Sequence, residues 1–368
     1  MKAVLLVPGS VRAERAEPAR AGLLPRDFFY GTLGLARYGY DLDFADTRAE
    51  PNGIAESLLL RYDILRNRLT RVGYSPRRFN AIASQLTDAT VAISPTDGFT
   101  MSLGLGMPRG ATCRIAGGFM GMSDLAERAR PGLRDLIKSR IARAIERLDH
   151  LFFFSEADRQ GGLAQYGIEP ARTSLFRFGV DTDFWCPAET AQDIEVLSVG
   201  SDPSRDYASL LGAGIRAGMT IITRLPVDTG GNPAVKVING SYGNSPIDDA
   251  ALRDLYRRAK VVVVPVEDVW QPSGQSVTMQ AMACGRPVVV TRNRGFWGEG
   301  ILHSGENCIL VPPRDRPALR DAVHAVLGDR DMADRLGRAA REVSVNFSIE
   351  AAEASMLSIV NAARAVTR

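Results

Sequence analysis

Lysine, histidine and cysteine are scarce in this chain of 368 residues. Only four of its 45 basic residues are lysines, so the net charge of +3 comes from an arginine-rich composition. Three histidines leave few members for a histidine-built metal site or a Ser-His-Asp triad. The four cysteines lie far apart without a CxxC pair, which indicates reduced thiols and excludes a disulfide framework.

Long apolar runs are also missing. No segment approaches the ~20 consecutive apolar residues that a membrane span needs, and the apolar start at residues 1–7 is too short for a secretory signal. We therefore expect a cytoplasmic protein, with peripheral contact at the inner face of the membrane left open. A chain of this length and ordinary globular composition predicts two domains, at roughly 150 residues each.

Short apolar runs alternate with helical stretches along the chain, which predicts an α/β protein with two doubly wound parallel sheets. The expected strands cover residues 2–8, 41–46, 90–93, 112–115, 151–154, 195–199, 220–223, 235–238, 260–264, 287–291 and 308–311. A turn-rich segment, residues 179–189, separates the two series. We expect one domain over residues 1–185 and another over 186–368, with C-terminal helices that close the second domain or cross back to the first.

Two segments of the first half are predicted from composition. The polar stretch after Gly9, rich in arginine, glutamate and proline up to about Pro25, predicts a long loop at the carboxyl end of the first strand. A helix is expected over about residues 27–38, where Gly39 would end it.

One strand–loop–helix–strand unit covers residues 260–291. Its helix begins after the loop that contains Ser273, Gly274, Gln275 and Ser276. A helix N-terminus offers unpaired N–H groups and a positive dipole end, and glycine lets the backbone approach a ligand. The pattern predicts an anion site fitted to a diphosphate, although an ordinary helix cap would also explain so short a motif.

The wider region resembles a known family. Residues 280–289, QAMACGRPVV, are similar to the EAMAxGxPVV signature of retaining GT-B glycosyltransferases, family 4 (glycosyl transferases group 1). Residues 305–315, 179–187 and 198–207 resemble further segments of that family, and their order holds over roughly residues 150–360. The resemblance implies a GT-B fold: two Rossmann-like domains facing a central cleft, the first for the acceptor and the second for a nucleotide-sugar donor.

This chain departs from the family at a pair of glutamates spaced Glu-x7-Glu. Gln280 stands at the second position and Pro272 at the first. The resemblance implies that Gln280 accepts hydrogen bonds from the donor's ribose through its amide oxygen, without a charge. Pro272 cannot replace the sugar-binding carboxylate, so Glu267 and Asp268 are candidates for a compensating acid.

The resemblance also assigns the donor's phosphates a basic partner. Arg205 aligns with a residue that neutralises the diphosphate in relatives, and we expect it to bind the donor and stabilise the leaving group. A second basic position is Ser201 here, and Arg224 is a weaker candidate for the missing charge. Residues 295–297, GFW, are expected either to line the nucleotide pocket or to pack at a domain interface.

The N-terminal half offers fewer candidates. Gly9 and Ser10 end the first strand and are expected near the donor. Asp97 follows the third strand at a position facing the binding crevice, where it could deprotonate an acceptor hydroxyl. Many relatives place a histidine after the fourth strand, but this chain has none there, and His150 is interpreted as structural.

Metal and cofactor are both expected to be absent from the mechanism. The two Asp-x-Asp triplets, Asp41/Asp43 and Asp181/Asp183, are interpreted as chance occurrences, so we expect no essential metal. No tightly bound cofactor is expected, and the nucleotide-diphosphate sugar is a co-substrate.

Basic residues gather at residues 61–78 and 128–147. In the second cluster an apolar helical stripe includes Ile137 and Ile141, so a basic amphipathic helix on an anionic membrane is one interpretation. A surface helix with its apolar face in the core is the favoured one. Nucleic acid is not an expected partner, because no aromatic platform accompanies the charge.

Together these features predict a glycosyltransferase that moves a hexose-type sugar with retention to an unknown acceptor, which is a carbohydrate, a lipid-linked molecule or a small molecule. Its setting would be glycan, glycolipid or cell-envelope polysaccharide synthesis. Two alternatives remain: an epimerase or hydrolase of nucleotide sugars with the same fold, and a non-catalytic binding scaffold.

Overall fold

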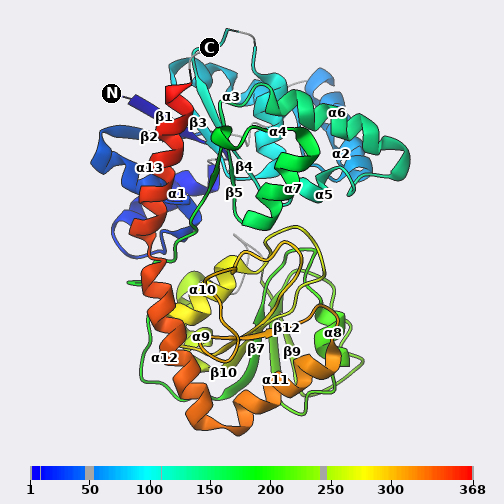
Figure 1. The fold of residues 1–368 in the computed structure, drawn as a ribbon, viewed down its shortest axis with the longest axis vertical. Helices are drawn as coiled ribbons and strands as arrows, with labels where there is room; N and C mark the ends of the chain where they lie inside the picture. Colours follow the sequence, from blue (N-terminus) through cyan, green and yellow to red (C-terminus); the bar gives the residue numbers. More distant parts are fainter. Residues whose placement is uncertain (1, 9, 46–53, 109, 241–246, 367–368) are drawn as a thin grey trace. The chain divides into compact units, whose positions relative to one another are not determined.

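The structure is a computed structural model that describes residues 2–8, 10–45, 54–108, 110–240 and 247–366. The chain forms two compact units (Figure 1). Unit 1 comprises Met1–Arg20, Phe28–Arg177 and Glu350–Arg368, and unit 2 comprises Ala21–Asp27 and Phe178–Ile349. Ala21–Asp27, from the expected first half, belongs to unit 2, and Glu350–Arg368, from the expected second half, belongs to unit 1. The assignment of acceptor and donor roles to residues 1–185 and 186–368 stays a prediction.

Unit 1 is built on a six-stranded parallel sheet with the order β2-β1-β3-β4-β5-β6. Its strands are β1 (Lys2–Leu6), β2 (Tyr40–Phe44), β3 (Val91–Ser94), β4 (Arg114–Phe119), β5 (His150–Phe153) and β6 (Thr173–Leu175). Its helices are α1 (Ser10–Arg20), α2 (Ile54–Thr70), α3 (Pro76–Asp88), α4 (Asp97–Gly106), α5 (Met122–Leu125), α6 (Arg134–Ile145), α7 (Glu156–Tyr166) and α13 (Ile349–Ala365). Strands β3 and β5 are buried along their whole length, as expected for central strands covered on both faces.

Unit 2 repeats this architecture with the strand order β12-β11-β10-β7-β8-β9. Its strands are β7 (Ile194–Val199), β8 (Met219–Thr223), β9 (Val235–Asn239), β10 (Ala259–Val264), β11 (Val288–Thr291) and β12 (Ile309–Val311). Its helices are α8 (Tyr207–Gly212), α9 (Asp249–Arg258), α10 (Gln275–Ala283), α11 (Arg316–Gly328) and α12 (Arg330–Asn346). The expectation of two doubly wound parallel sheets is confirmed.

The prediction of a loop after the first strand is wrong. Residues 10–20 form α1, although Pro18 lies inside it. Arg12 is buried; its Nε donates to the carbonyl of Phe28 at 2.8 Å, and its guanidinium lies 4.5 Å from the centre of the Phe28 ring. Tertiary contacts therefore stabilise this polar helix, and its sequence lacks the apolar periodicity that would have predicted it.

The prediction of a single helix over residues 27–38 is also wrong. Two short 3₁₀ segments occur instead, Asp27–Phe29 and Thr32–Tyr38. The backbone φ angles of Tyr30 and Gly31 are 51° and 73°, which no right-handed helix accommodates. The two segments are therefore separated at these residues, and Asp27 is set apart in unit 2.

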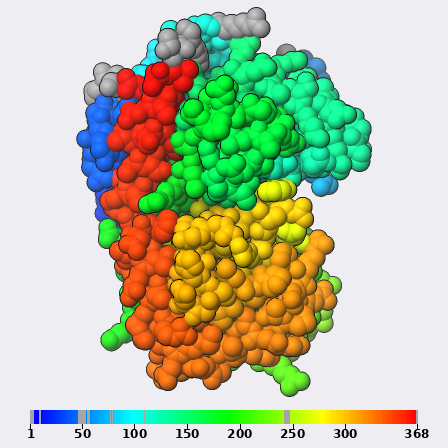
Figure 2. All heavy atoms as spheres, viewed as in Figure 1, coloured from blue at the N-terminus to red at the C-terminus, as the bar shows by residue number. Residues whose placement is uncertain are grey.

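The C-terminal helix α13 packs within unit 1. The hydroxyl of Tyr40 donates to Oδ1 of Asn361 at 2.8 Å, and Nη1 of Arg364 donates to the same hydroxyl at 3.0 Å. In Figure 2 the red residues of this helix lie beside the blue residues of the N-terminal part. The first strands and the last helix thus complete one core.

In each sheet the chain first adds strands on one side of its first strand and then adds the remaining strands on the other side. In unit 2 the chain passes from β7 to β8 and β9 on one side, then returns to β10, β11 and β12 on the other. In unit 1 the corresponding point lies between β1 and β3. Ligands of doubly wound sheets bind outside the carboxyl ends of the strands at this switch point. The carboxyl ends of β7 and β10 are thus where a unit 2 ligand would be sought.

Candidate functional site

Two loops meet at the switch point of unit 2. Arg205, in the loop after β7, forms an isolated antiparallel bridge with Val266, which follows β10. The next residue, Asp206, donates its N–H to the carbonyl of Pro265 at 3.1 Å. Both loops therefore lie together beside the start of α10.

Arg205 is a buried cation that forms no ion pair with the described residues. Its side chain is only 9% exposed, and neither Nε nor Nη1 has a hydrogen-bond partner among the described residues. Burial lowers the pKa of the guanidinium, although arginine stays protonated in proteins. Asp202 is close enough to act on that pKa, but its carboxylate accepts from Ser204 and Gln271. A buried cation of this kind is costly unless an anion pairs with it.

Two glycines make room for this side chain. A Cβ at Gly200 would lie 2.2 Å from Nε of Arg205, and one at Gly274 would lie 3.1 Å from its Nη1. Gly274 also has φ of +85°, a conformation that other residues rarely adopt. The guanidinium is thus held between the end of β7 and the N-cap of α10 by positions that exclude larger residues.

The start of α10 adds further donors. Gly274 is its N-cap, and no described side chain caps the first turn. The hydroxyl of Ser273 is buried and has no hydrogen-bond partner in the described part of the chain. Helix N–H groups, a serine hydroxyl and an arginine fork together suit a phosphate or diphosphate. We call Arg205, Ser273 and the N-terminus of α10 the anion site.

Three further residues expected at the site, Gln275, Ser276 and Gln280, lie on α10. Gln275 is partly exposed and Ser276 is exposed, so both are accessible at the helix start. Gln280, one turn further along, uses both ends of its amide inside unit 2. Its Nε2 donates to Oδ2 of Asp27 at 3.0 Å, and its Oε1 accepts from the hydroxyl of Tyr256 at 3.3 Å. Its role toward a ribose stays a prediction.

Asp27 is the centre of a buried polar network that the sequence did not reveal. Besides Gln280, its carboxylate accepts from Nε1 of Trp185 at 2.8 Å and from the backbone N–H of Asp181 at 2.7 Å. Burial raises the pKa of Asp27 to about 6, despite these hydrogen bonds. The carboxylate of Asp181 is in turn paired with Nε of Arg26 at 2.7 Å. This network fixes the segment Ala21–Asp27 onto unit 2.

Asp27 makes the stability of unit 2 depend on pH. Its folded-state pKa of about 6 lies above the ordinary value of 3.8, so between these values the folded state holds more protons than the unfolded state. Stability should therefore fall as pH rises from about 4 to about 6, by up to about 3 kcal/mol. We expect Asp27→Asn to flatten this part of the profile in urea denaturation. Asp183→Asn, which changes an exposed carboxylate, should leave it as in the wild type; an unchanged profile in Asp27→Asn would contradict this account.

Asp97, a candidate of unit 1, lies at the loop after β4. Asp97 begins α4; its Oδ1 accepts the N–H of Met120 at 2.7 Å, and its Oδ2 lies 3.3 Å from Nη1 of Arg128. Burial raises the pKa of Asp97, and Arg128 opposes that shift. The side chain thus holds this loop, and its role as a base stays a prediction. Ser10 begins α1, and Gly9 lies outside the described residues.

A carboxylate that the sequence did not single out holds the same loop. Asp158 accepts the backbone N–H groups of Gly121, Met122 and Ser123 at 2.8 to 3.0 Å, and burial raises its pKa to about 6. His150 is buried, and its Nε2 lies 2.8 Å from the hydroxyl of Ser174. These contacts support its interpretation as a structural residue.

The remaining sequence candidates have local partners. Glu267 pairs with Arg314 at 2.7 Å and Asp268 with Arg294 at 2.5 Å, which leaves both acids occupied in surface ion pairs. The hydroxyl of Ser201 accepts the backbone N–H of Arg224 at 2.9 Å. Phe296 and Trp297 are buried. Among the residues that the structure describes, no group of three or more metal-ligating side chains occurs.

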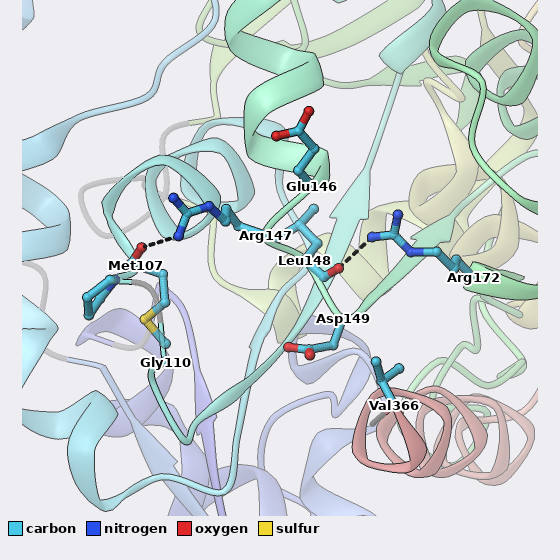
Figure 3. Close-up of a pocket in the computed structure, with 9 residues that line it drawn as sticks. Met107, Gly110, Glu146, Arg147, Leu148, Asp149, Arg172 and Val366 are labelled. Atoms are coloured by element: carbon cyan, nitrogen blue, oxygen red, sulfur yellow. Dashed lines mark hydrogen bonds between the residues drawn. The ribbon is translucent and has the colours of Figure 1, made fainter. Parts of the chain in front are cut away.

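A hollow of about 410 Å³ lies elsewhere in unit 1 (Figure 3). It is lined by Met107, Pro108, Gly110, Glu146, Arg147, Leu148, Asp149, Arg172 and Val366. These residues precede β4, β5 and β6 or come from the C-terminal segment, so the hollow lies at the amino edge of the sheet. Arg147 donates to the carbonyl of Met107 and Arg172 to that of Leu148. The hollow contains none of the residues expected at the site.

Comparison with solved structures defines the fold. Sucrose-phosphate synthase of Thermosynechococcus elongatus superposes with a TM-score of 0.69 over 98% of both chains, at 16% identity. Anabaena HepE, solved in complex with UDP and glucose, gives a TM-score of 0.68 over 98% of this chain and 99% of its own, at 12% identity. The chain has the GT-B fold that its sequence led us to expect.

Comparison of sequences gives matches to parts of the chain. The family model for glycosyl transferases group 1 matches residues 232–329, which confirms the resemblance over this segment. A D-inositol 3-phosphate glycosyltransferase of Kribbella flavida is 27% identical over 240 residues, 56% of this chain and 54% of its own length. A glycogen synthase of Mycobacterium tuberculosis is 38% identical over 96 residues, 26% and 22% of the two chains. The chain thus spans about half the length of its first curated relative.

Proposed function

We propose that this protein is a glycosyltransferase that moves a hexose-type sugar from a nucleoside-diphosphate donor to an acceptor hydroxyl. The observation that carries the proposal is the buried guanidinium of Arg205 beside the N-terminus of α10, for which the described residues supply neither a counter-ion nor a side-chain cap. A diphosphate offers the charge and the oxygen acceptors that both features require. The match of residues 232–329 to the glycosyl transferases group 1 supports the same reaction.

The proposed chemistry proceeds with retention of configuration and needs no protein nucleophile. As the bond from the sugar to the diphosphate breaks, negative charge grows on the leaving phosphate. Arg205, the hydroxyl of Ser273 and the helix N-terminus are placed to stabilise it. The acceptor hydroxyl gives its proton to the leaving phosphate while its oxygen bonds to the anomeric carbon on the same face. Asp97 is proposed to orient that hydroxyl.

The wider setting is part of the proposal. The reaction uses the nucleotide sugar as a co-substrate, with no essential metal and no tightly bound cofactor. The acceptor is a carbohydrate, a lipid-linked molecule or a small molecule, within glycan, glycolipid or envelope polysaccharide synthesis. The protein works in the cytoplasm, in peripheral contact with the inner face of the membrane.

A donor-turnover assay tests the reaction. The purified chain is incubated with UDP-, GDP- and ADP-hexoses, with and without a mixture of sugar, inositol phosphate and lipid-extract acceptors, and release of nucleoside diphosphate is measured. We expect release that depends on an acceptor, and proton NMR of the product should show the donor's anomeric configuration. Release without any acceptor would instead support a hydrolase. No release from any donor, with the donors still bound, would support a non-catalytic scaffold.

A further inference from the structure

The helix α2 of unit 1 turns its apolar side to solvent. Thirteen large apolar side chains are exposed in the described part of the chain, and six of them lie on this one helix. Ile54, Leu58, Tyr62 and Leu65 are 83%, 59%, 57% and 57% exposed. Their spacing of four, four and three residues places them along one face of the helix. We call these four residues the α2 stripe.

The opposite side of α2 explains this orientation. Asp63 and Arg66 are buried and form an ion pair at 2.8 Å, with Thr70 buried one turn further on. The hydroxyl of Ser75 donates to Asp63, and the guanidinium of Arg66 lies 4.1 Å from the centre of the Tyr74 ring. The polar side is thus anchored in the unit by specific contacts. A helix that buries its charges and exposes its leucines is the reverse of an ordinary surface helix.

The charge beside the stripe is positive. Arg61 and Arg68, seven residues apart and both exposed, lie along one margin of the stripe, and exposed Arg71 follows the helix. Of the acids whose side chains the structure describes on α2, Asp63 alone occurs, and it is buried. Exposed leucines and a tyrosine flanked by arginines form the pattern of a helix that lies in the interface of an anionic bilayer.

The other basic helix of this unit has the ordinary arrangement. On α6 the apolar residues Ile137, Ile141 and Ile145 are buried. The favoured interpretation of this helix from sequence, with its apolar face in the core, is therefore confirmed. The exposed apolar face therefore lies on α2, which overlaps the first basic cluster, and not on α6.

We infer that the α2 stripe, with Arg61 and Arg68, docks unit 1 onto an anionic lipid surface. The inference deepens the proposed function and rests on it, because the stripe would hold the enzyme at the membrane that carries its acceptor. A second copy of the chain fits less well, since it would bring two arginine-bearing margins together. Among the described helices none is long and apolar enough to cross a membrane, and the contact inferred here is with the bilayer surface.

Vesicle flotation with the full chain tests the inference. We expect binding to vesicles that contain phosphatidylglycerol, at least tenfold weaker binding to pure phosphatidylcholine, and loss of binding as salt rises. Leu58→Ser combined with Leu65→Ser should weaken binding at least tenfold, and Arg61→Gln combined with Arg68→Gln should remove the preference for anionic lipid. Leu136→Ser, a change to a leucine of α6 that is similarly exposed, is the matched control and should bind as the wild type does.

Three results would overturn the inference. One is a wild-type chain that does not float with anionic vesicles, and another is equal binding by the Leu58/Leu65 variant. The third is a wild-type dimer in light scattering that the same variant converts to a monomer, which would make the stripe an interface between copies. Thermal stabilisation by nucleoside diphosphates is measured in parallel. It should be unchanged in these surface variants, so failure of docking and failure of the proposed reaction give different results.

Discussion

Replacing Arg205 by alanine should weaken the binding of nucleoside diphosphates by at least about 100-fold. Hydrogen bonds to charged groups contribute about 1.5 to 3 kcal/mol each, and this side chain offers two buried N–H donors without partners among the described residues. Titration calorimetry with UDP, GDP and ADP measures the loss. Arg205→Lys keeps the charge but not the fork, so its affinity should fall between those of the wild type and Arg205→Ala.

The same substitution should not lower the stability of the ligand-free protein. Removing a buried cation that has no counter-ion among the described residues takes away a desolvation cost, so the ligand-free variant should melt no lower than the wild type. Saturation of the wild type with a diphosphate at 100 times its Kd should add about 2.7 kcal/mol, and the variant should lose most of this gain. Arg320→Ala, at an exposed ion pair on α11, is the control. A variant that melts far below the wild type, or binds diphosphate equally well, would contradict the assignment.

Replacing Gly295 by alanine should destabilise unit 2 by at least about 2 kcal/mol. A Cβ at this position would lie 1.9 Å from the carbonyl oxygen of Trp270, so the backbone must move. The N–H of Gly295 donates to the carbonyl of Val269 at 2.9 Å, and Nδ2 of Asn293 donates to the same carbonyl. These bonds hold the loop that leads into Ser273. The substitution should therefore also weaken diphosphate binding, although Arg205 is intact.

Urea denaturation and calorimetry together measure both effects. Gly328→Ala is the matched control, because a Cβ there meets no atom within 4 Å and the residue ends α11. It should leave stability and binding close to those of the wild type. Wild-type stability in Gly295→Ala would show that the contact with Trp270 does not constrain this loop.

The sequence predicts those parts of the molecule whose signal is local. The four valines of residues 261–264 are β-branched and buried, and the structure has β10 there. Gly274 and the residues that follow it mark the start of α10, because a glycine cap and a helical composition are visible without the fold. All six strands of unit 2 were predicted for the same reason.

The parts that were missed depend on contacts between distant residues. Residues 10–20 carry no helical periodicity, and α1 is stabilised by Arg12 packing on Phe28. The network of Asp27 joins that residue to Asp181, Trp185 and Gln280, more than 150 positions away. The outward orientation of α2 depends on the contacts of Asp63 and Arg66 with residues outside the helix. No local pattern encodes such pairings.

The central claim is that the anion site of unit 2 binds the diphosphate of a nucleotide. Calorimetric titration of the wild-type chain with UDP, GDP and ADP, each against its parent nucleoside, tests it most directly. The account predicts that at least one diphosphate binds and that its nucleoside binds at least 100-fold more weakly. The absence of binding by all three diphosphates, or equal binding by a diphosphate and its nucleoside, would contradict it.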